Sequence, residues 1–275
     1  MKLFAILLAA FATLAVYLFA TAPTPLPDDA EASLQSIPTE RAIAILAAHQ
    51  NLARTLYTSE IVTAGTRQGL KFGEQWKQRE IDEGPLPALF LREIGTIIQK
   101  SELNLGLFLG SDFPISPSNK FDKDQMASFN KVKDTRGPVF SIAKGNGKFI
   151  AMFPDFASVQ GCVSCHNAHR DSAKSDWQLN DVMGATTWTY PKALVQPNEF
   201  ARMLVILRQS TKQAYESYVS KALKFNQTPG IGSKWPRDGY YIPSADVFMQ
   251  EFDRRAAGAA LDAVLKTLTS SSYSG

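Results

Sequence analysis

The sequence predicts an α+β fold in which helices are followed by antiparallel strands and then by two more helices. Three observations indicate this order. Apolar residues recur at steps of three and four in 39–63 and 86–100, they alternate with other residues in 103–109, and two short apolar runs flank a Gly-Asn-Gly turn at 145–147. The chain has 275 residues, of which 45% are apolar and 20% charged, so it can build a globular core.

The segment 3–22 predicts a membrane helix. It contains no charged residue, and a helix of this length is about 30 Å long, enough to cross a bilayer. A lysine precedes it and acidic residues follow it, which places the later chain outside the cytoplasm. A cleaved signal peptide is the alternative, because residues 20–22 have a small-x-small pattern.

We therefore expect a signal anchor or signal peptide at 1–22 and a polar, Pro-rich linker at 23–38. Either interpretation exports the rest of the chain. The predicted location is the periplasmic side of a bacterial inner membrane, with anchoring by the N-terminal helix, or the periplasm itself after cleavage.

The first helix of the globular part is predicted from Thr39 to about Thr63. Its apolar stripe consists of Ile45, Ala48, His49, Leu52 and Leu56. A second helix is expected at 86–100, and a strand at 103–109 follows it, since Leu103, Leu105, Leu107 and Leu109 alternate with other residues.

Later elements follow from turn residues and periodicity. The runs PVFSIA and KFIAMF flank 144–147, where two glycines and an asparagine permit the positive φ of a tight hairpin. Residues 182–190 indicate another strand. Two amphipathic helices are predicted at 199–224 and 244–269, joined by a loop rich in Gly and Pro. We expect a domain at 39–192 and a helical extension at 193–275.

The residues with the clearest chemistry form one pentapeptide, Cys162-Val163-Ser164-Cys165-His166. It matches C-x-x-C-H, the attachment pattern of c-type haem. Two thiols at this spacing can add to the two vinyl groups of one haem, and the adjacent imidazole can ligate its iron. We expect one covalent haem c, attached to Cys162 and Cys165, with His166 as the proximal ligand.

Three alternatives to haem remain open for this motif. The cysteines can form a local redox disulfide, although the preceding PDFASVQG indicates a loop rather than the strand that a thioredoxin-like motif follows. They can bind zinc together with His166 and His169, but neighbouring ligands in one short loop do not easily close a tetrahedron. The match can also be accidental.

The stretch CVSCHNAHRDSAKSDWQLNDVMGATTWTYP, residues 162–191, resembles the haem segment of a family of exported, PAS-like c-type haem domains. The resemblance extends to 86–94 and 110–117 and covers roughly 40–192. It implies a PAS-like antiparallel sheet with flanking helices, and a module that senses redox state or a small ligand, or that transfers electrons. In some members a cysteine of the N-terminal helix is the sixth iron ligand, and this chain has none there.

His49 is our candidate for the sixth ligand, because the chain has only three histidines and this one lies on the apolar stripe of the N-terminal helix. His169 follows the proximal ligand too closely to reach the other haem face. Met152, Met183 and an open position are the alternatives.

Several other residues are candidates for contacts with haem. Arg54, Arg170 and Lys174 can neutralise propionates, and Trp177 and Trp188 can pack on a porphyrin. In each case an ordinary solvated charge or core aromatic is the alternative.

The composition limits the function further. A net charge of +3, spread along the chain, excludes a nucleic-acid partner. No hydrolase, nucleotide-binding or metalloprotease motif occurs, so we expect no enzyme. The predicted function is a haem-based redox or small-ligand sensing module with a redox or signalling partner protein. An electron-transfer cytochrome is the first alternative, and a haem enzyme such as a peroxidase is the second.

Overall fold

The structure is a computed structural model that describes residues 36–143 and 145–271, together with isolated positions between 4 and 21; side chains are described as far as residue 258. Residues 36–275 form one compact unit and residues 1–35 another. No helix in the described part is both long and apolar enough to cross a membrane. The membrane helix predicted at 3–22 falls almost entirely outside that part, and so does most of the predicted linker.

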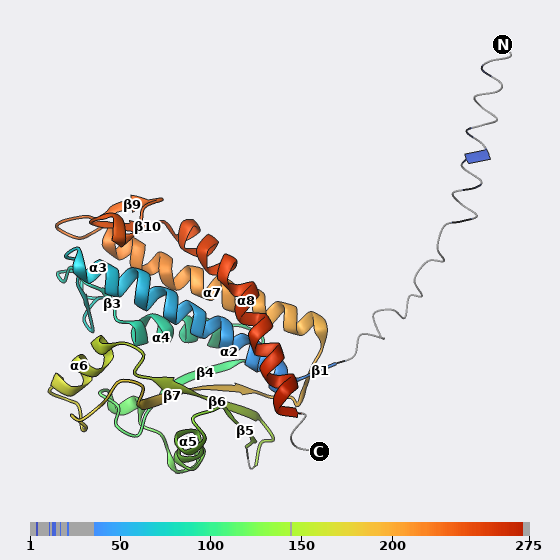
Figure 1. Cartoon of the computed structure of the whole chain (residues 1–275), viewed down its shortest axis with the longest axis horizontal. Coiled ribbons are helices and arrows are strands. Elements are labelled where there is room, and N and C mark those ends of the chain that lie inside the picture. Colours follow the sequence, from blue (N-terminus) through green and yellow to red (C-terminus); the bar gives the residue numbers. More distant parts are fainter. Residues whose placement is uncertain are drawn as a thin grey trace. The chain divides into compact units, whose positions relative to one another are not determined.

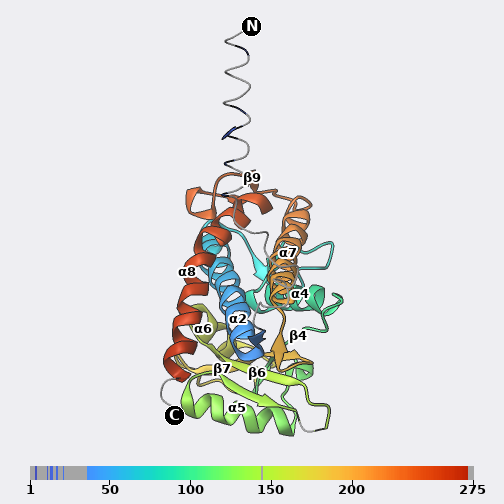
Figure 2. The same ribbon diagram turned by 90° about the vertical axis from the view of Figure 1, so that its right-hand side faces the viewer.

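The unit beginning at residue 36 has three layers (Figures 1 and 2), and a four-stranded antiparallel sheet is the middle one. A helical layer covers one face of the sheet, and α5 covers the other. The helical layer consists of α2 (Thr39–Leu56), α4 (Pro87–Gln99), α7 (Pro197–Ala222) and α8 (Ala245–Ser271). The α+β prediction is therefore confirmed at the level of mixed helix and sheet.

The sheet has the strand order β4-β7-β6-β5. Its strands are β4 (Gly106–Gly110), β5 (Val139–Ile142), β6 (Phe149–Phe156) and β7 (Val182–Tyr190). Successive residues face opposite layers: Ala151 packs with the helical layer, and Met152 packs on the side of α5. The predicted hairpin is confirmed, because β5 pairs with β6 and Gly145 has a φ of 104° between them.

The main core lies between the sheet and the helical layer. Tyr57 stacks on Phe90 with a ring separation of 4.2 Å, and Tyr215 stacks on Phe248 at 4.1 Å. The Tyr57 hydroxyl donates to the Pro85 carbonyl, and burial raises the pKa of this tyrosine well above its ordinary value. These residues come from different helices, so the core fixes how the helices pack.

The N-terminal helix continues beyond the predicted apolar stripe. After α2 the chain makes a π-helical turn at Tyr57–Thr63 and then enters α3 (Ala64–Arg67). Short strands join the ends of the helices: β1 (Ile37–Pro38) pairs with β8 (Leu194–Val195), β2 (Phe72–Gly73) with β3 (Gly84–Pro85), and β9 (Gly230–Gly232) with β10 (Tyr241–Pro243). Turns of 3-10 helix occur at Pro117–Asn119 and Pro236–Asp238.

Helix α5 (Lys123–Thr135) is an element that the sequence analysis missed. Only Phe129 and Val132 of this helix are buried, so its apolar periodicity is weak. Its start is fixed by a capping box, in which the Asp122 carboxylate accepts from the Gln125 backbone and the Gln125 side chain accepts from the Asp122 backbone. The D-x-x-Q pattern was the signal in the sequence.

Helix α7 also contacts a loop that lies far away in the sequence. The Lys221 side chain is only 9% exposed, and its ammonium donates to the carbonyls of Gln78 and Arg79 at 2.5 and 3.3 Å. The Asn226 backbone N–H donates to the Asp82 carboxylate. The last turn of α7 and the residues after it therefore contact the segment 74–82 at residues 78, 79 and 82.

Candidate haem-attachment site

The C-x-x-C-H motif lies on a helix, α6 (Gln160–Ala168), at one end of the sheet (Figure 1). The interpretation of PDFASVQG as a loop was wrong for most of its length. Residues 154–156 belong to β6, because Phe156 still pairs with Val182 of β7, and only 157–159 connect β6 to α6. The motif thus follows a strand closely, as it does in thioredoxin-like proteins, so this spacing no longer counts against a redox disulfide.

The helix brings the three predicted attachment residues to one face. Cys162, Cys165 and His166 are related by steps of three and four, which places their side chains side by side on an α-helix. Cys165 is exposed and Cys162 is half-buried, and both thiols are free. Both thiols are therefore positioned to react with one planar group.

The imidazole of His166 is neutral and, within the described residues, lacks a hydrogen-bond partner at one nitrogen. Burial lowers its pKa, His169 lowers it further, and Glu74 acts in the opposite direction, so the ring is neutral near pH 7. Its Nδ1 is buried and has no hydrogen-bond partner in the part of the chain that the structure describes. A neutral imidazole is the form that ligates iron.

The electrostatics of Cys165 disfavour a catalytic dithiol. Burial raises the pKa of this thiol, and the charges of Glu74 and Cys162 raise it further. Thiol oxidoreductases use a nucleophilic thiolate, which a lowered pKa favours. No cluster of three or more His, Cys, Asp or Glu suited to a metal ion occurs within the described residues. The donor set fits a haem that is attached through neutral thiols and ligated by one imidazole.

The opposite side of α6 is buried. Val163 is 7% exposed and packs with Ala157 and Trp177, and Cys162 and Met183 border this cluster. Of the two tryptophans considered for porphyrin packing, Trp177 therefore lies at the motif. Trp188 lies in the main core between sheet and helices.

The candidate sixth ligands lie in different places. His49 is on α2, its Nδ1 donates to the Ile45 carbonyl at 2.8 Å, and its ring lies 6.3 Å from that of Phe252 of α8. These contacts are within α2 and with α8, and neither of them joins His49 to α6. Met183 borders the Trp177 cluster beside Cys162. Met152 is buried with Phe129 of α5 on the other face of the sheet.

The three basic residues considered for propionate contacts all have carboxylate neighbours. Arg54 pairs with Asp155 of β6, and Lys174 pairs with Asp176 while lying over the Trp177 ring. Arg170 is 90% exposed in its side chain and lies 3.4 Å from its neighbour Asp171. Contact with a propionate would therefore compete with an existing ion pair in each case.

His169 is engaged elsewhere. Its Nδ1 accepts from the Asp171 backbone N–H at 3.1 Å, and its Nε2 lies 3.7 Å from a Glu74 carboxylate oxygen. Glu74 comes from the loop after β2, and sequence reasoning missed it because nothing local indicates that residue 74 meets residue 169. Glu74, the first residue of the segment 74–82, thus lies beside the C-terminal end of α6.

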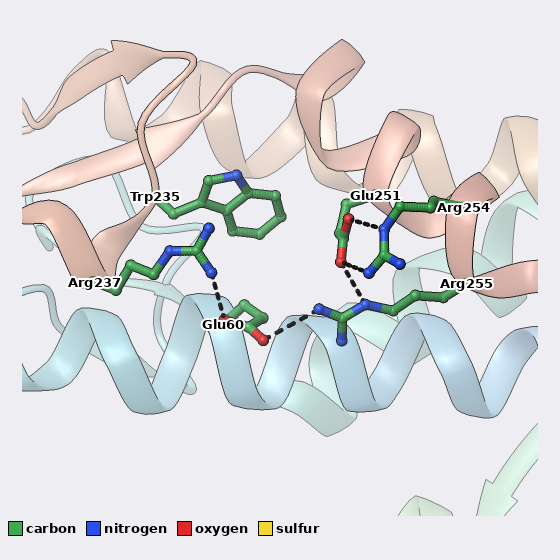
Figure 3. Close-up of a pocket in the computed structure, with 6 residues that line it drawn as sticks. All are labelled: Glu60, Trp235, Arg237, Glu251, Arg254 and Arg255. Carbon is green, nitrogen blue, oxygen red and sulfur yellow. Dashed lines mark hydrogen bonds and ion pairs between the residues drawn. The ribbon is translucent and has the colours of Figure 1, made fainter.

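The surface has a hollow that includes Glu74 and another that contains no residue of α6. The first, of about 340 Å³, lies between the 74–78 loop and α4, and Glu74, Arg92 and Glu93 are among its lining residues. The second, which we call the arginine hollow, has about 290 Å³ and is lined by Glu60, Trp235, Arg237, Glu251, Arg254 and Arg255 (Figure 3). In the arginine hollow both carboxylates are already paired: Arg255 lies 3.3 Å from Glu60 and 2.6 Å from Glu251.

The comparison with protein families decides the classification. The sequence model of the Tll0287-like family matches residues 31–191, more than half of the chain and all of the C-x-x-C-H motif. The chain belongs to the Tll0287-like family. This is a c-type haem domain family, of the kind that the motif and the resemblance predicted.

The Tll0287-like match runs from before α2 to the end of β7. It includes both sides of the contact between Glu74 and His169, whereas α7 and α8 lie outside it. No curated protein matches the chain, and no solved structure does.

Proposed function

We propose that this member of the Tll0287-like family is a c-type haem protein. Cys162 and Cys165 provide the thioether links, and His166 is the proximal ligand. The observation that carries the proposal is the common face of α6, where two free thiols lie beside a neutral imidazole. When bound, the haem supplies one-electron chemistry or an iron site for a small ligand.

The proposed role is a redox or small-ligand sensing module, without enzymatic activity, on the periplasmic side of a bacterial inner membrane. Support for export comes from the uncharged segment 3–22. Support for a PAS-like module comes from the family match and from the order of the four-stranded sheet, in which its first strand along the chain, β4, lies beside its last, β7. A redox or signalling partner protein completes this proposal.

A simple electron carrier is the second candidate; it requires a second protein ligand, for which His49 is the candidate from the sequence. Because Nδ1 donates to a carbonyl, the lone pair of this ring is on Nε2, as in histidines that ligate metals. A haem with two permanent protein ligands transfers electrons and does not bind gases. Addition of carbon monoxide to the reduced protein separates the roles: a changed spectrum supports sensing, and an unchanged one supports electron transfer.

The central experiment measures attached haem. The full chain is produced alongside a cytochrome maturation system, and its intact mass is determined under denaturing conditions. We expect the mass of one haem on the wild type and the bare polypeptide mass for the Cys162→Ser/Cys165→Ser double variant. A colourless wild type at bare mass contradicts the proposal.

The sixth ligand is tested by absorption spectra of His49→Ala and Met183→Leu. The variant that removes the ligand loses the low-spin spectrum, whereas the other one keeps it. Met152→Leu is the matched control, because this methionine is buried on the α5 side of the sheet. Wild-type spectra for both His49→Ala and Met183→Leu remove both residues from the axial position.

Exported topology is tested by N-terminal sequencing of the mature protein from membrane and periplasmic fractions. An intact N-terminus in the membrane fraction supports the anchor, and a start near residue 23 in the soluble periplasm supports cleavage. Protein retained in the cytoplasm contradicts the proposed location.

A further inference from the structure

The side chain of Asn167, the residue after the proposed iron ligand, is bound to a single distant residue. Its Nδ2 donates to the Trp177 carbonyl at 3.0 Å, and its Oδ1 accepts from the Trp177 backbone N–H at 2.8 Å. A primary amide pairs with a peptide unit in this way only in one orientation, because one side must donate and the other must accept. The pair therefore fixes the rotation of the Asn167 side chain.

Trp177 contacts α6 a second time through its ring. The indole is 5% exposed and packs with Val163, which precedes Asn167 by four residues and lies on the same face of the helix. The thiols and the imidazole lie on the adjoining face. Trp177 thus binds the side of α6 that carries Val163 and Asn167, and it leaves the face with the thiols and the imidazole uncovered.

The loop at 169–181 is attached to both ends of α6. At the other end, the Ala157 N–H donates to the Asp181 carbonyl and the Asn180 N–H donates to the Ala157 carbonyl, both at 2.9 Å. The first turn of α6 has no side-chain cap at Val159. At this end the contacts are the backbone bonds of Ala157 and the apolar packing of Val163, neither of which is a directional side-chain hydrogen bond. The Asn167 pair is therefore the contact best placed to resist rotation of the helix about its axis.

We propose that Asn167 is a positioning residue that sets the orientation of the His166 imidazole at the haem iron through its pair with Trp177. This inference rests on the proposed haem function. The backbone between His166 and Asn167 transmits any rotation of one residue directly to the other. The ligand orientation in turn influences the reduction potential and the magnetic anisotropy of the iron.

The test compares the wild type, Asn167→Ala and Asn167→Asp in the haem-loaded full chain. The readouts are the reduction potential and the electron paramagnetic resonance spectrum of the oxidised protein. We expect Asn167→Ala to retain covalent haem, to shift the potential and to show more than one iron species. Asn167→Asp keeps the acceptor for the Trp177 N–H and loses the donor. Its added negative charge shifts the potential by itself, so for this variant the electron paramagnetic resonance spectrum is the readout, and we expect more than one iron species.

The matched control is Gln160→Ala at the first turn of α6. The Gln160 amide is exposed and reaches only Ser164 of its own helix, at 3.5 Å, so this variant is expected to have wild-type readouts. If Asn167→Ala keeps the wild-type potential and spectrum while its melting temperature falls, Asn167 has a structural role alone and the inference is wrong.

Two other outcomes are separable. A wild type without covalent haem contradicts the proposed function itself, and the inference about Asn167 falls with it. If Asn167→Ala does not accumulate, the electron paramagnetic resonance spectrum of Asn167→Asp decides: more than one iron species supports the positioning role, and a wild-type spectrum overturns it.

Discussion

The α6 face and the arginine hollow both gather polar side chains, and they differ in how those side chains are partnered. In the hollow, Glu251 accepts from Arg254 and Arg255 (Figure 3), and Glu60 pairs with Arg255 as well. On α6, both thiols are free and His166 has a buried nitrogen without a partner in the described structure. A dense ion-pair network satisfies its own polar groups, whereas the α6 face keeps two free thiols and an imidazole nitrogen that are open to reaction or ligation.

The largest expected effect concerns the α6 face, where the proposed iron ligand lies. His166→Gly removes the proposed ligand, and we expect the low-spin spectrum to be lost almost completely while some haem remains attached through the cysteines. Added imidazole is expected to restore the spectrum by occupying the vacated position. The measurement is an absorption spectrum of purified protein with and without imidazole.

His169→Gly is the control for that substitution. His169 is bound to Asp171 and lies near Glu74, so its loss is expected to leave the spectrum unchanged. A wild-type spectrum for His166→Gly, or an equal loss in His169→Gly, contradicts the proximal assignment.

A substitution in the core is expected to lower stability without changing the haem chemistry. Phe90 is fully buried and stacks on Tyr57, so Phe90→Ala should lower the free energy of unfolding by about 3–5 kcal/mol. Denaturant unfolding measures the loss, and the spectrum of the folded fraction should match the wild type. A changed spectrum would show that the core and the α6 face are coupled.

Breaking the arginine hollow is expected to have a smaller effect. Arg255→Ala removes contacts to both Glu60 and Glu251, but the Arg255 side chain is 32% exposed, so the loss should be at most about 1 kcal/mol. Chemical denaturation measures it, with Arg170→Ala as an exposed control. Loss of haem or of the native spectrum in Arg255→Ala would remove the contrast between the two regions.

The smallest effect concerns acid stability. Hydrogen bonding from Arg254, the largest cause that lowers it, brings the pKa of Glu251 from 4.5 to about 2. Because the folded-state pKa is the lower one, the carboxylate stabilises the fold above about pH 4.5, and this contribution is lost as the pH falls toward 2. Glu251→Gln should therefore melt slightly below the wild type at pH 7, and the difference should vanish near pH 2. A difference that is constant over this range contradicts the ionic origin.

Local patterns predicted most of the elements because burial leaves a periodic trace in the sequence. The helix at 86–100 and the strand at 182–190 are confirmed to within a residue or so by α4 and β7. Helix α5 was missed because most of its residues face solvent, and the length of β6 was underestimated because residues 154–156 were interpreted as part of a loop. Strand pairing with β7 overrides that local signal.

The candidate site likewise has residues that the sequence predicted and residues that it did not. Cys162, Cys165 and His166 were found because all three are encoded within five consecutive residues. Glu74 and the pair between Asn167 and Trp177 depend on tertiary contacts, which no local spacing encodes. The roles of His49 and Met183 stay predictions, since an axial ligand is defined by its distance to an iron.

The contact of Lys221 with the 74–82 segment bears on whether the part of the chain that the family model matches can fold by itself. The family match ends at residue 191, but the ammonium group of Lys221 in α7 donates hydrogen bonds to the backbone carbonyls of Gln78 and Arg79. In this chain α7 thus stabilises a loop that precedes it by more than a hundred residues in the sequence.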